Sequence, residues 1–180
     1  MPIWGISERQ LALPHAEIQC AFPVVDDREL WAGKITAAML RAEPRDLYDL
    51  ACMPEEIKGS TDLRRTTLLL ASGARHDLRT VHVHAIEQLT FKKIEERLYP
   101  VIRAGGVLAA DRLKENACKI ITMILNFKEQ ERNYLDLLLD QGDYQPEHLF
   151  PEKQLLERVR KHPVLLWKAK NVREFKRRDP

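Results

Sequence analysis

Apolar residues recur at three- and four-residue spacing through most of the chain, which is the pattern of amphipathic helices. The first such stretch follows Asp26 or Asp27, either of which can cap a helix that runs to about Ala42. Gly33 inside this helix costs about 1 kcal/mol relative to alanine, which indicates a close approach by another backbone or by a ligand. Lys34 lies in or beside the apolar face, which consists of Leu30, Trp31, Ile35, Ala38, Met39 and Ala42.

Start and stop signals divide the rest of the chain into further helices. Pro44 suits the first position of a helix that ends before Pro54, and Gly142 suits the residue after a helix end. The last helix follows Pro163, and its apolar positions predict a buried side. That side consists of Leu165, Leu166 and Val172. The remaining predicted helices cover residues 44–53, 62–72, 91–102, 111–140 with a break near 126–130, and 153–161.

Residues 1–25 show no helical period. Within them Glu17 to Phe22 alternates imperfectly and predicts an edge strand that Pro23 ends. A single strand makes no sheet, so it either pairs with a segment absent from this chain or forms an extended arm. Residues 80–89 fit a strand or a helix equally well. The pattern therefore predicts a mainly α fold, a helical bundle with one short strand at its N-terminal end.

Composition fits one ordinary globular domain. The chain has 180 residues, of which 44% are hydrophobic, 31% are charged and only 7 are glycine. No apolar run approaches the length of about 18 residues that a membrane span needs, and residues 1–10 lack the pattern of a signal peptide. The three cysteines suggest neither a disulfide framework nor a zinc site. We expect a reducing, cytoplasmic location without membrane contact.

The net charge of +2 conceals a basic tail. Residues 153–178 hold ten Lys and Arg and two Glu, or +8, while the rest holds 19 basic and 25 acidic residues, or −6. Such a tail suits a phosphate-facing surface, although a solvated amphipathic helix explains the same residues. The candidates for RNA binding, which mix one aromatic side chain with cations, are Lys161, Trp167, Lys168, Lys170 and Arg173.

Two carboxylates three residues apart are the strongest sign of chemistry. On a helix Asp46 and Asp49 share a face, with Arg45 beside them and Lys34 on the preceding helix. This set could bind Mg²⁺ or a polyphosphate, since Mg²⁺ takes one or two carboxylates plus water and phosphate oxygens. In the structural alternative, Asp46 pairs with Lys34 or Arg45 and locks the two helices together.

Other motifs carry weaker signals. His82 and His84 would face one side of a strand as metal ligands, but no third ligand is evident nearby. Gly105-Gly106 lacks the lysine and hydroxyl residue of a phosphate-binding loop, so it reads as a helix terminator.

The segment ELWAGKITAAMLRAEPRDLYDL, residues 29–50, resembles the AbiEii/AbiGii family of nucleotidyltransferase toxins, and YLDLLLDQGDYQPEHLFPEKQLLERVRKHPVLLWKAKNVREF is similar to that family's C-terminus. The resemblance implies a polymerase-β-like core that transfers a nucleotide from an NTP with Mg²⁺, in some members to tRNA, under the control of an antitoxin protein. It implies that Lys34 contacts the nucleotide phosphates, that Arg45 and Asp46 support the site, and that Asp49 matches the second aspartate of the motif.

The chain lacks the family's Gly-Gly or Gly-Ser turn followed by Asp-x-Asp. We therefore expect residues 1–25 to be the remnant of the nucleotidyltransferase core and residues 26–180 to be the helical C-terminal domain, and Met1 is either the true start or an internal methionine of a longer sequence. Without the metal motif we expect neither Mg²⁺ nor NTP to bind tightly, and no activity from this chain alone. Leu30, Trp31, Ile3 and Trp4 would then be exposed and favour self-association. The alternative is a non-catalytic helical module that binds RNA or an antitoxin through its basic tail.

Overall fold

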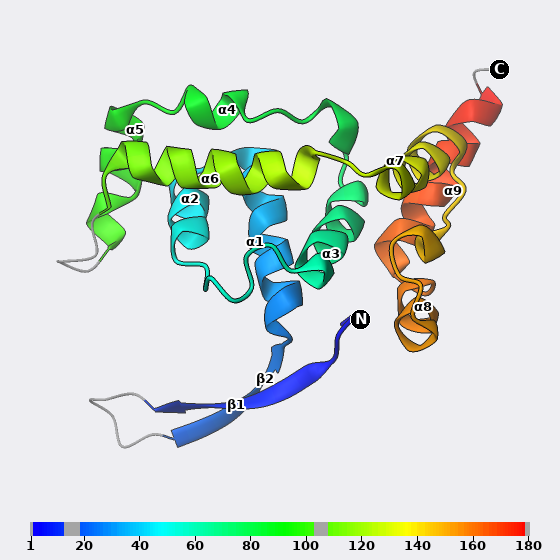
Figure 1. The fold of residues 1–180 in the computed structure, drawn as a ribbon, viewed down its shortest axis with the longest axis horizontal. Helices are drawn as coiled ribbons and strands as arrows, with labels where there is room; N and C mark the ends of the chain where they lie inside the picture. The colour runs from blue at the N-terminus through cyan, green and yellow to red at the C-terminus, as the bar shows by residue number, and fades with distance from the viewer. Residues whose placement is uncertain (1, 13–18, 103–107, 179–180) are drawn as a thin grey trace.

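A computed structural model describes residues 2–12, 19–102 and 108–178. These residues form a mainly helical fold with a two-stranded antiparallel sheet at the N-terminal end, which projects away from the helices (Figure 1). The predicted mainly α class is confirmed. None of the helices in these ranges is long and apolar enough to cross a bilayer.

The N-terminal strand has its partner within the chain. Strand β1, Ile6–Ala12, pairs with β2, Gln19–Val25, so that Ile6 lies opposite Val25. The expectation of an unpaired strand was wrong because the sequence of β1, ISERQLA, carries no apolar alternation. Pro23 does not end β2 but lies opposite Glu8, since a strand at a sheet edge tolerates a residue without an N–H. Residues 17 and 18 of the predicted strand lie outside the described residues.

Helix α1, Asp27–Arg41, begins as predicted. The Asp26 side chain caps it by accepting a hydrogen bond from the Arg28 N–H at 2.9 Å. Ala42 has φ 49°, a left-handed residue that ends α1 and lets α2, Pro44–Ala51, start in a new direction. The buried side of α1 consists of Ala32, Ile35, Ala38 and Met39.

Helices α3, Thr61–Ser72, and α6, Ala110–Leu125, pack against α1 and α2 to form the main core. Residues 80–89, for which strand and helix were both open, end the 3₁₀ turn η1, Leu78–Thr80, and form the short helix α4, His84–Glu87. Helix α5, Phe91–Arg97, and the 3₁₀ turn η2, Tyr99–Val101, complete this part. Gly105 and Gly106 lie outside the described residues.

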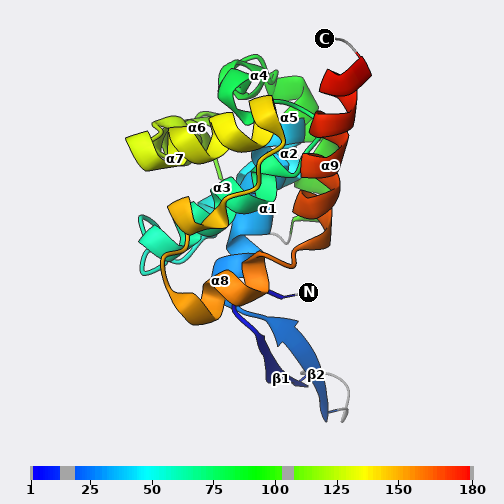
Figure 2. The ribbon, with the colours of Figure 1, turned by 90° about the vertical axis from the view of Figure 1, so that its right-hand side faces the viewer.

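The C-terminal elements form a second group beside α3 (Figure 2). The break predicted near 126–130 is confirmed, because α7, Glu129–Asp136, starts anew and continues as the π turn η3, Leu137–Gln141. Gly142 ends that turn with φ 66°, as predicted. The 3₁₀ turn η4, Pro146–His148, and the helix α8, Lys153–Val159, lead to α9, Pro163–Arg178.

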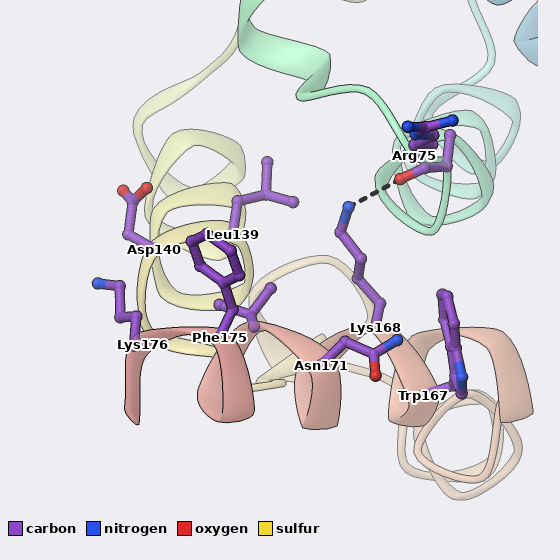
Figure 3. A pocket seen from close by; sticks show the side chains of 10 residues that line it. Arg75, Leu139, Asp140, Trp167, Lys168, Asn171, Phe175 and Lys176 are labelled. Atoms are coloured by element: carbon purple, nitrogen blue, oxygen red, sulfur yellow. Dashed lines mark hydrogen bonds between the residues drawn. The ribbon is translucent and has the colours of Figure 1, made fainter. Parts of the chain in front are cut away.

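Helix α9 packs on η3 through only part of its apolar side. Leu165 and Ala169 are buried, whereas Leu166, predicted to be buried, is 47% exposed. Leu166 adjoins Leu165 in sequence, so on a helix it points about 100° away from the contact. The Lys168 Nζ donates a hydrogen bond to the Ala74 carbonyl at 2.8 Å, which ties α9 to the end of α3 (Figure 3).

Two buried polar contacts join the first group of helices to the second. The hydroxyls of Ser72 on α3 and Tyr134 on α7 lie 2.9 Å apart, both fully buried. Arg64 binds both carboxylate oxygens of Glu131 at 2.6 Å, with both side chains largely buried. Burial raises the pKa of Glu131, but hydrogen bonds from Arg64 and the Lys128 N–H outweigh it and leave that pKa lowered.

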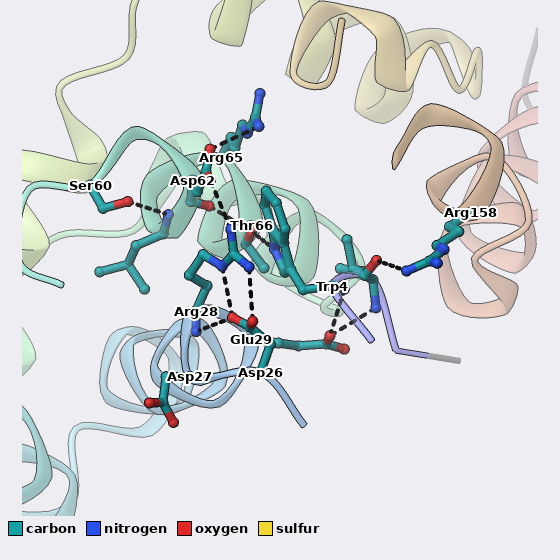
Figure 4. A network of polar contacts seen from close by, with 12 residues as sticks. Trp4, Asp26, Asp27, Arg28, Glu29, Ser60, Asp62, Arg65, Thr66 and Arg158 are labelled. Atoms are coloured by element: carbon teal, nitrogen blue, oxygen red, sulfur yellow. Dashed lines mark hydrogen bonds and ion pairs between the residues drawn. The ribbon is translucent and has the colours of Figure 1, made fainter. Parts of the chain in front are cut away.

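The residues before β1 pack on the helices, contrary to the expectation that they would be exposed. Ile3 is 1% exposed, and its N–H donates to the Glu29 carboxylate at 2.8 Å. The Trp4 indole N–H donates to the Thr66 hydroxyl at 2.9 Å, and the Arg28 guanidinium lies 3.8 Å from the Trp4 ring centroid (Figure 4). These contacts hold the N-terminal segment on α1 and α3.

Candidate functional site

Helices α1 and α2 bring Lys34 and Asp49 together. The reversal at Ala42 lays α2 against α1, and the Lys34 Nζ then lies 2.7 Å from an oxygen of Asp49. Both side chains remain partly open to solvent, at 30% and 39% exposure. The Trp31 ring, with its centroid 5.6 Å from the same Nζ, covers one side of the ammonium group.

Asp46 is engaged by Arg41 rather than by the predicted partners. Its side chain is 2% exposed, and its two oxygens accept hydrogen bonds from Arg41 at 2.9 and 2.7 Å. One oxygen also accepts the Glu43 N–H at 3.3 Å, which caps the start of α2. The expected pairing with Lys34 or Arg45 is wrong in its partner, although Asp46 does lock α1 to α2. The hydrogen bond to Asp46 is the main cause of a raised pKa at Arg41.

Arg41 was missed by sequence reasoning. It stands in the last turn of α1, five residues before Asp46, a spacing that no single helix brings together. Only the left-handed Ala42 between the two helices folds the guanidinium back onto the carboxylate. The signal in the sequence that could have indicated this contact is a basic residue, Arg41, shortly before the Pro-x-Asp start of α2.

A cavity of about 440 Å³ opens beside these pairs. Its wall includes Gly33, where an added Cβ would meet nothing within 4 Å. The predicted approach of another backbone to Gly33 is therefore absent among the described residues, and the space in front of Gly33 is open to a ligand. The lining residues are Val25, Glu29, Leu30, Gly33, Lys34, Ala37, Arg41, Asp46 and Asp49.

The charges in the cavity differ in how firmly they are held. Glu29 accepts the N–H groups of Ile3 and Trp4, and buried Asp46 is bound on two sides. The Lys34–Asp49 contact is a single ion pair between half-exposed groups, a type that contributes about 0–1 kcal/mol. Lys34 is therefore the cation of this cavity that an incoming anion displaces most readily from its partner.

Arg45 is not brought into this site. It is exposed on another side of α2 and lines a separate cavity of about 340 Å³ with Glu43, Pro44 and Arg97. The reason is its helical position, because Arg45 is adjacent to Asp46 and so points about 100° away from it.

The carboxylates of the α1–α2 cavity are mostly engaged by protein groups. In the parts of the chain that the structure describes, no three His, Cys, Asp or Glu side chains gather where they could hold a metal ion. Asp46 gives both oxygens to Arg41, Glu29 gives one oxygen to the N–H groups of Ile3 and Trp4, and Asp49 is bound only by Lys34. His82 and His84, the weaker metal candidates, are exposed, and the His84 ring bonds Gln88 instead.

The RNA-binding candidates are spread over several surfaces. Lys168 is held by the Ala74 carbonyl, and Lys170 pairs with Glu174 at 3.6 Å along α9. Lys161 lines another cavity, with Gln154, Glu157 and Arg158. Arg173 is exposed beside Gly142, and Trp167 is 63% exposed. The described residues therefore show no single basic surface that unites all five.

Comparison with known proteins identifies a family. Residues 2–151 match the family model described as nucleotidyl transferase AbiEii toxin, type IV TA system. The match includes both helices of the α1–α2 cavity, and residues 152–180 lie beyond it. No curated protein and no solved structure matches the chain.

Proposed function

The chain belongs to the AbiEii family of nucleotidyl transferase toxins of type IV toxin–antitoxin systems, and from this premise we propose that its α1–α2 cavity receives the phosphates of an NTP through Lys34. One observation carries the proposal: Lys34 stands on the wall of an open cavity and is held only by a half-exposed ion pair. A triphosphate offers several anionic oxygens in place of the one that Asp49 supplies.

The other residues of the cavity have positioning roles in this proposal. Arg41 and Asp46 fix α2 against α1 and so set the distance between Lys34 and Asp49. Asp49 holds Lys34 when no nucleotide is present and turns away when phosphate binds. Arg45 has no place in the cavity, so the proposal gives it no contact with the NTP.

Nucleotidyl transfer by this chain alone is not expected. The transfer depends mainly on metal ions and on positioning, and the sequence lacks the Asp-x-Asp motif that supplies the family's metal ligands. The acidic metal ligands would come from further sequence or from a partner chain. By the same proposal the acceptor is tRNA, and the controlling antitoxin is a separate protein.

Binding of a fluorescent NTP analogue, followed by anisotropy without and with Mg²⁺, tests the site. We expect Lys34→Ala to weaken binding at least tenfold, which corresponds to about 1.4 kcal/mol. Lys92→Ala, an equal change at an exposed lysine of α5, serves as the matched control and should leave binding within twofold. Asp49→Asn should tighten binding, because it removes the carboxylate that competes with phosphate for Lys34.

The lack of activity has its own assay. The chain incubated with tRNA, labelled NTPs and Mg²⁺ should transfer no label. Transfer that is lost in Lys34→Ala would refute the expected inactivity while supporting the site. Equal NTP binding by the wild type, Lys34→Ala and Lys92→Ala would refute the site itself.

A further inference from the structure

Helix α9, the π turn η3 and the end of α3 enclose an open groove of about 1040 Å³. Figure 3 shows α9 as its floor, with Leu139 and Asp140 of η3 at one side and Arg75 at the other. The groove lies at the C-terminal group of helices, apart from the α1–α2 cavity, and α9 lies wholly beyond the family match. Its lining residues are Ala74, Arg75, Leu139, Asp140, Trp167, Lys168, Asn171, Val172, Phe175 and Lys176.

Large apolar side chains are left open along this groove. Trp167 is 63% exposed and Phe175 is 69% exposed, among the highest values of any large hydrophobic residue in the described ranges. They lie eight residues apart on α9, about 12 Å at 1.5 Å per residue. Leu139 and Val172 lie in the same lining. Exposed apolar side chains that gather around a groove mark a contact surface rather than scattered exposure.

Two of the three cations in the groove lining lack an ion-pair partner among the described residues, while the third, Lys168, is held by the Ala74 carbonyl. Arg75 and Lys176 are exposed, and neither forms an ion pair within 4 Å with any described side chain. Asp140 is the acidic member of the lining, and Arg79 binds both of its oxygens at 2.6 and 2.7 Å. That contact is the largest cause of the lowered pKa of Asp140, although the same guanidinium also binds Asp77 and Asp136. Within the lining, the three cations Arg75, Lys168 and Lys176 outnumber this one carboxylate. The groove therefore presents apolar surface flanked by positive charge.

We propose that this groove binds an acidic amphipathic helix of a partner protein. A helix is about 10 Å across with its side chains, so a volume near 1040 Å³ accommodates roughly 13 Å of it, or two to three turns. Its apolar residues would lie between Trp167 and Phe175, and its carboxylates would reach Arg75 and Lys176. This is the helix-in-groove form of peptide recognition.

The lining favours an acidic helix over a single-stranded nucleic acid or a second copy of this chain. Trp167 and Phe175 could stack on the bases of a single-stranded nucleic acid, but Leu139 and Val172 add aliphatic surface with no π-face, which suits the apolar side chains of a helix better than bases. A second copy of this chain would bring another α9, and residues 153–178 carry +8 in each copy, so their contact is repulsive. An acidic helix satisfies both the apolar and the charged parts of the lining.

Selection from a phage library of 16-residue peptides tests the proposal without assuming a sequence. The full wild-type chain is the bait. Peptides that also bind the Phe175→Ser/Lys176→Glu variant are discarded, because they bind outside the groove. Both residues are exposed, so the variant should keep the wild-type circular dichroism spectrum and melting temperature. We expect enriched peptides with apolar residues at three- and four-residue spacing and with Asp or Glu on the flanks.

The best peptide is then labelled, and its Kd is measured by anisotropy against single variants. Phe175→Ser and Lys176→Glu should each weaken binding at least tenfold. Leu166→Ser and Lys170→Glu, equal changes on α9 outside the groove, should stay within twofold. The proposal is overturned if no groove-dependent peptide is enriched, if enriched peptides lack acidic residues, or if the control variants weaken binding equally. It is also overturned if a labelled 15-nucleotide oligouridine binds in the groove, lost in Phe175→Ser, while no peptide does.

Discussion

Asp46→Asn tests whether the buried Asp46 carboxylate holds α2 against α1. The substitution keeps the shape of a side chain that is 2% exposed but removes its charge. The single oxygen of asparagine can still accept from the Arg41 Nε and the Glu43 N–H, which now share one Asp46 oxygen, and its NH₂ group then faces the other guanidinium nitrogen without an acceptor. The variant therefore loses one charge-assisted contact at 2.7–2.9 Å and leaves a buried donor unpaired.

The expected loss of stability follows from that geometry. Hydrogen bonds to charged groups contribute about 1.5–3 kcal/mol each, and Arg41, half-exposed at 51%, places this one in the lower half of the range. We expect unfolding free energy to fall by about 2 kcal/mol. With a urea m-value near 2.5 kcal/mol/M, the midpoint should fall by about 0.8 M.

The assay is urea unfolding followed by circular dichroism, with two comparisons. Asp49→Asn removes a single, partly exposed ion pair and should cost at most about 0.5 kcal/mol. In a double-mutant cycle, Arg41→Gln with Asp46→Asn should cost little more than either alone, with a coupling near 1.5 kcal/mol. If Asp46→Asn leaves the midpoint within 0.2 M (about 0.5 kcal/mol at that m-value), or costs no more than Asp49→Asn, Asp46 does not lock α1 to α2.

Three further changes have directions fixed by the structure. Gly33→Ala should raise the unfolding free energy by up to about 1 kcal/mol, which thermal melts can check, because residue 33 is helical and a Cβ there meets nothing. The same variant should weaken NTP binding in the anisotropy assay if the nucleotide occupies the space in front of Gly33. Gly142→Ala should lower the unfolding free energy by at least about 2 kcal/mol, because the new Cβ would lie 2.5 Å from the Ala169 carbonyl oxygen. Gly59→Ala, at φ 78° with nothing within 4 Å, should lose only the backbone cost of about 1 kcal/mol, so equal melting temperatures of the two variants would contradict this. Burial lowers the pKa of His162, so this imidazole takes up a proton at a higher pH in the unfolded chain than in the folded one, and stability should fall as pH drops through about 6.5. Thermal melts between pH 7.5 and 5.5 should show this fall in the wild type and lose the part due to His162 in His162→Gln.

Local signals in the sequence were enough to predict the helices of the main core. Asp26 as a cap, Pro44 at a helix start and Gly142 at a helix end each act within one turn, so their effect can be read from neighbouring residues. The hairpin was only half predicted, because β1 is recognisable only through its pairing with β2. Pairing depends on contacts across the sheet, which periodicity in one segment does not reveal.

The candidate site shows the same division. The sequence grouped Lys34 with both aspartates of α2, but the pairing it offered was with Asp46, whereas Lys34 in fact meets Asp49. The partner of Asp46 was not anticipated, because Arg41 reaches it across a turn whose direction depends on one left-handed residue. The packing of Trp4 on α3 was missed for a similar reason, since Thr66 lies 62 residues away in sequence.

The hairpin is attached to the helices at both of its ends, and to the same helix. Before β1, the N–H groups of Ile3 and Trp4 bind Glu29 in the first turn of α1, and after β2, Asp26 caps that turn. The two strands therefore extend from the start of α1, about one and a half turns ahead of Lys34. Val25, the last residue of β2, also lines the α1–α2 cavity, so the hairpin ends in the wall that carries Lys34.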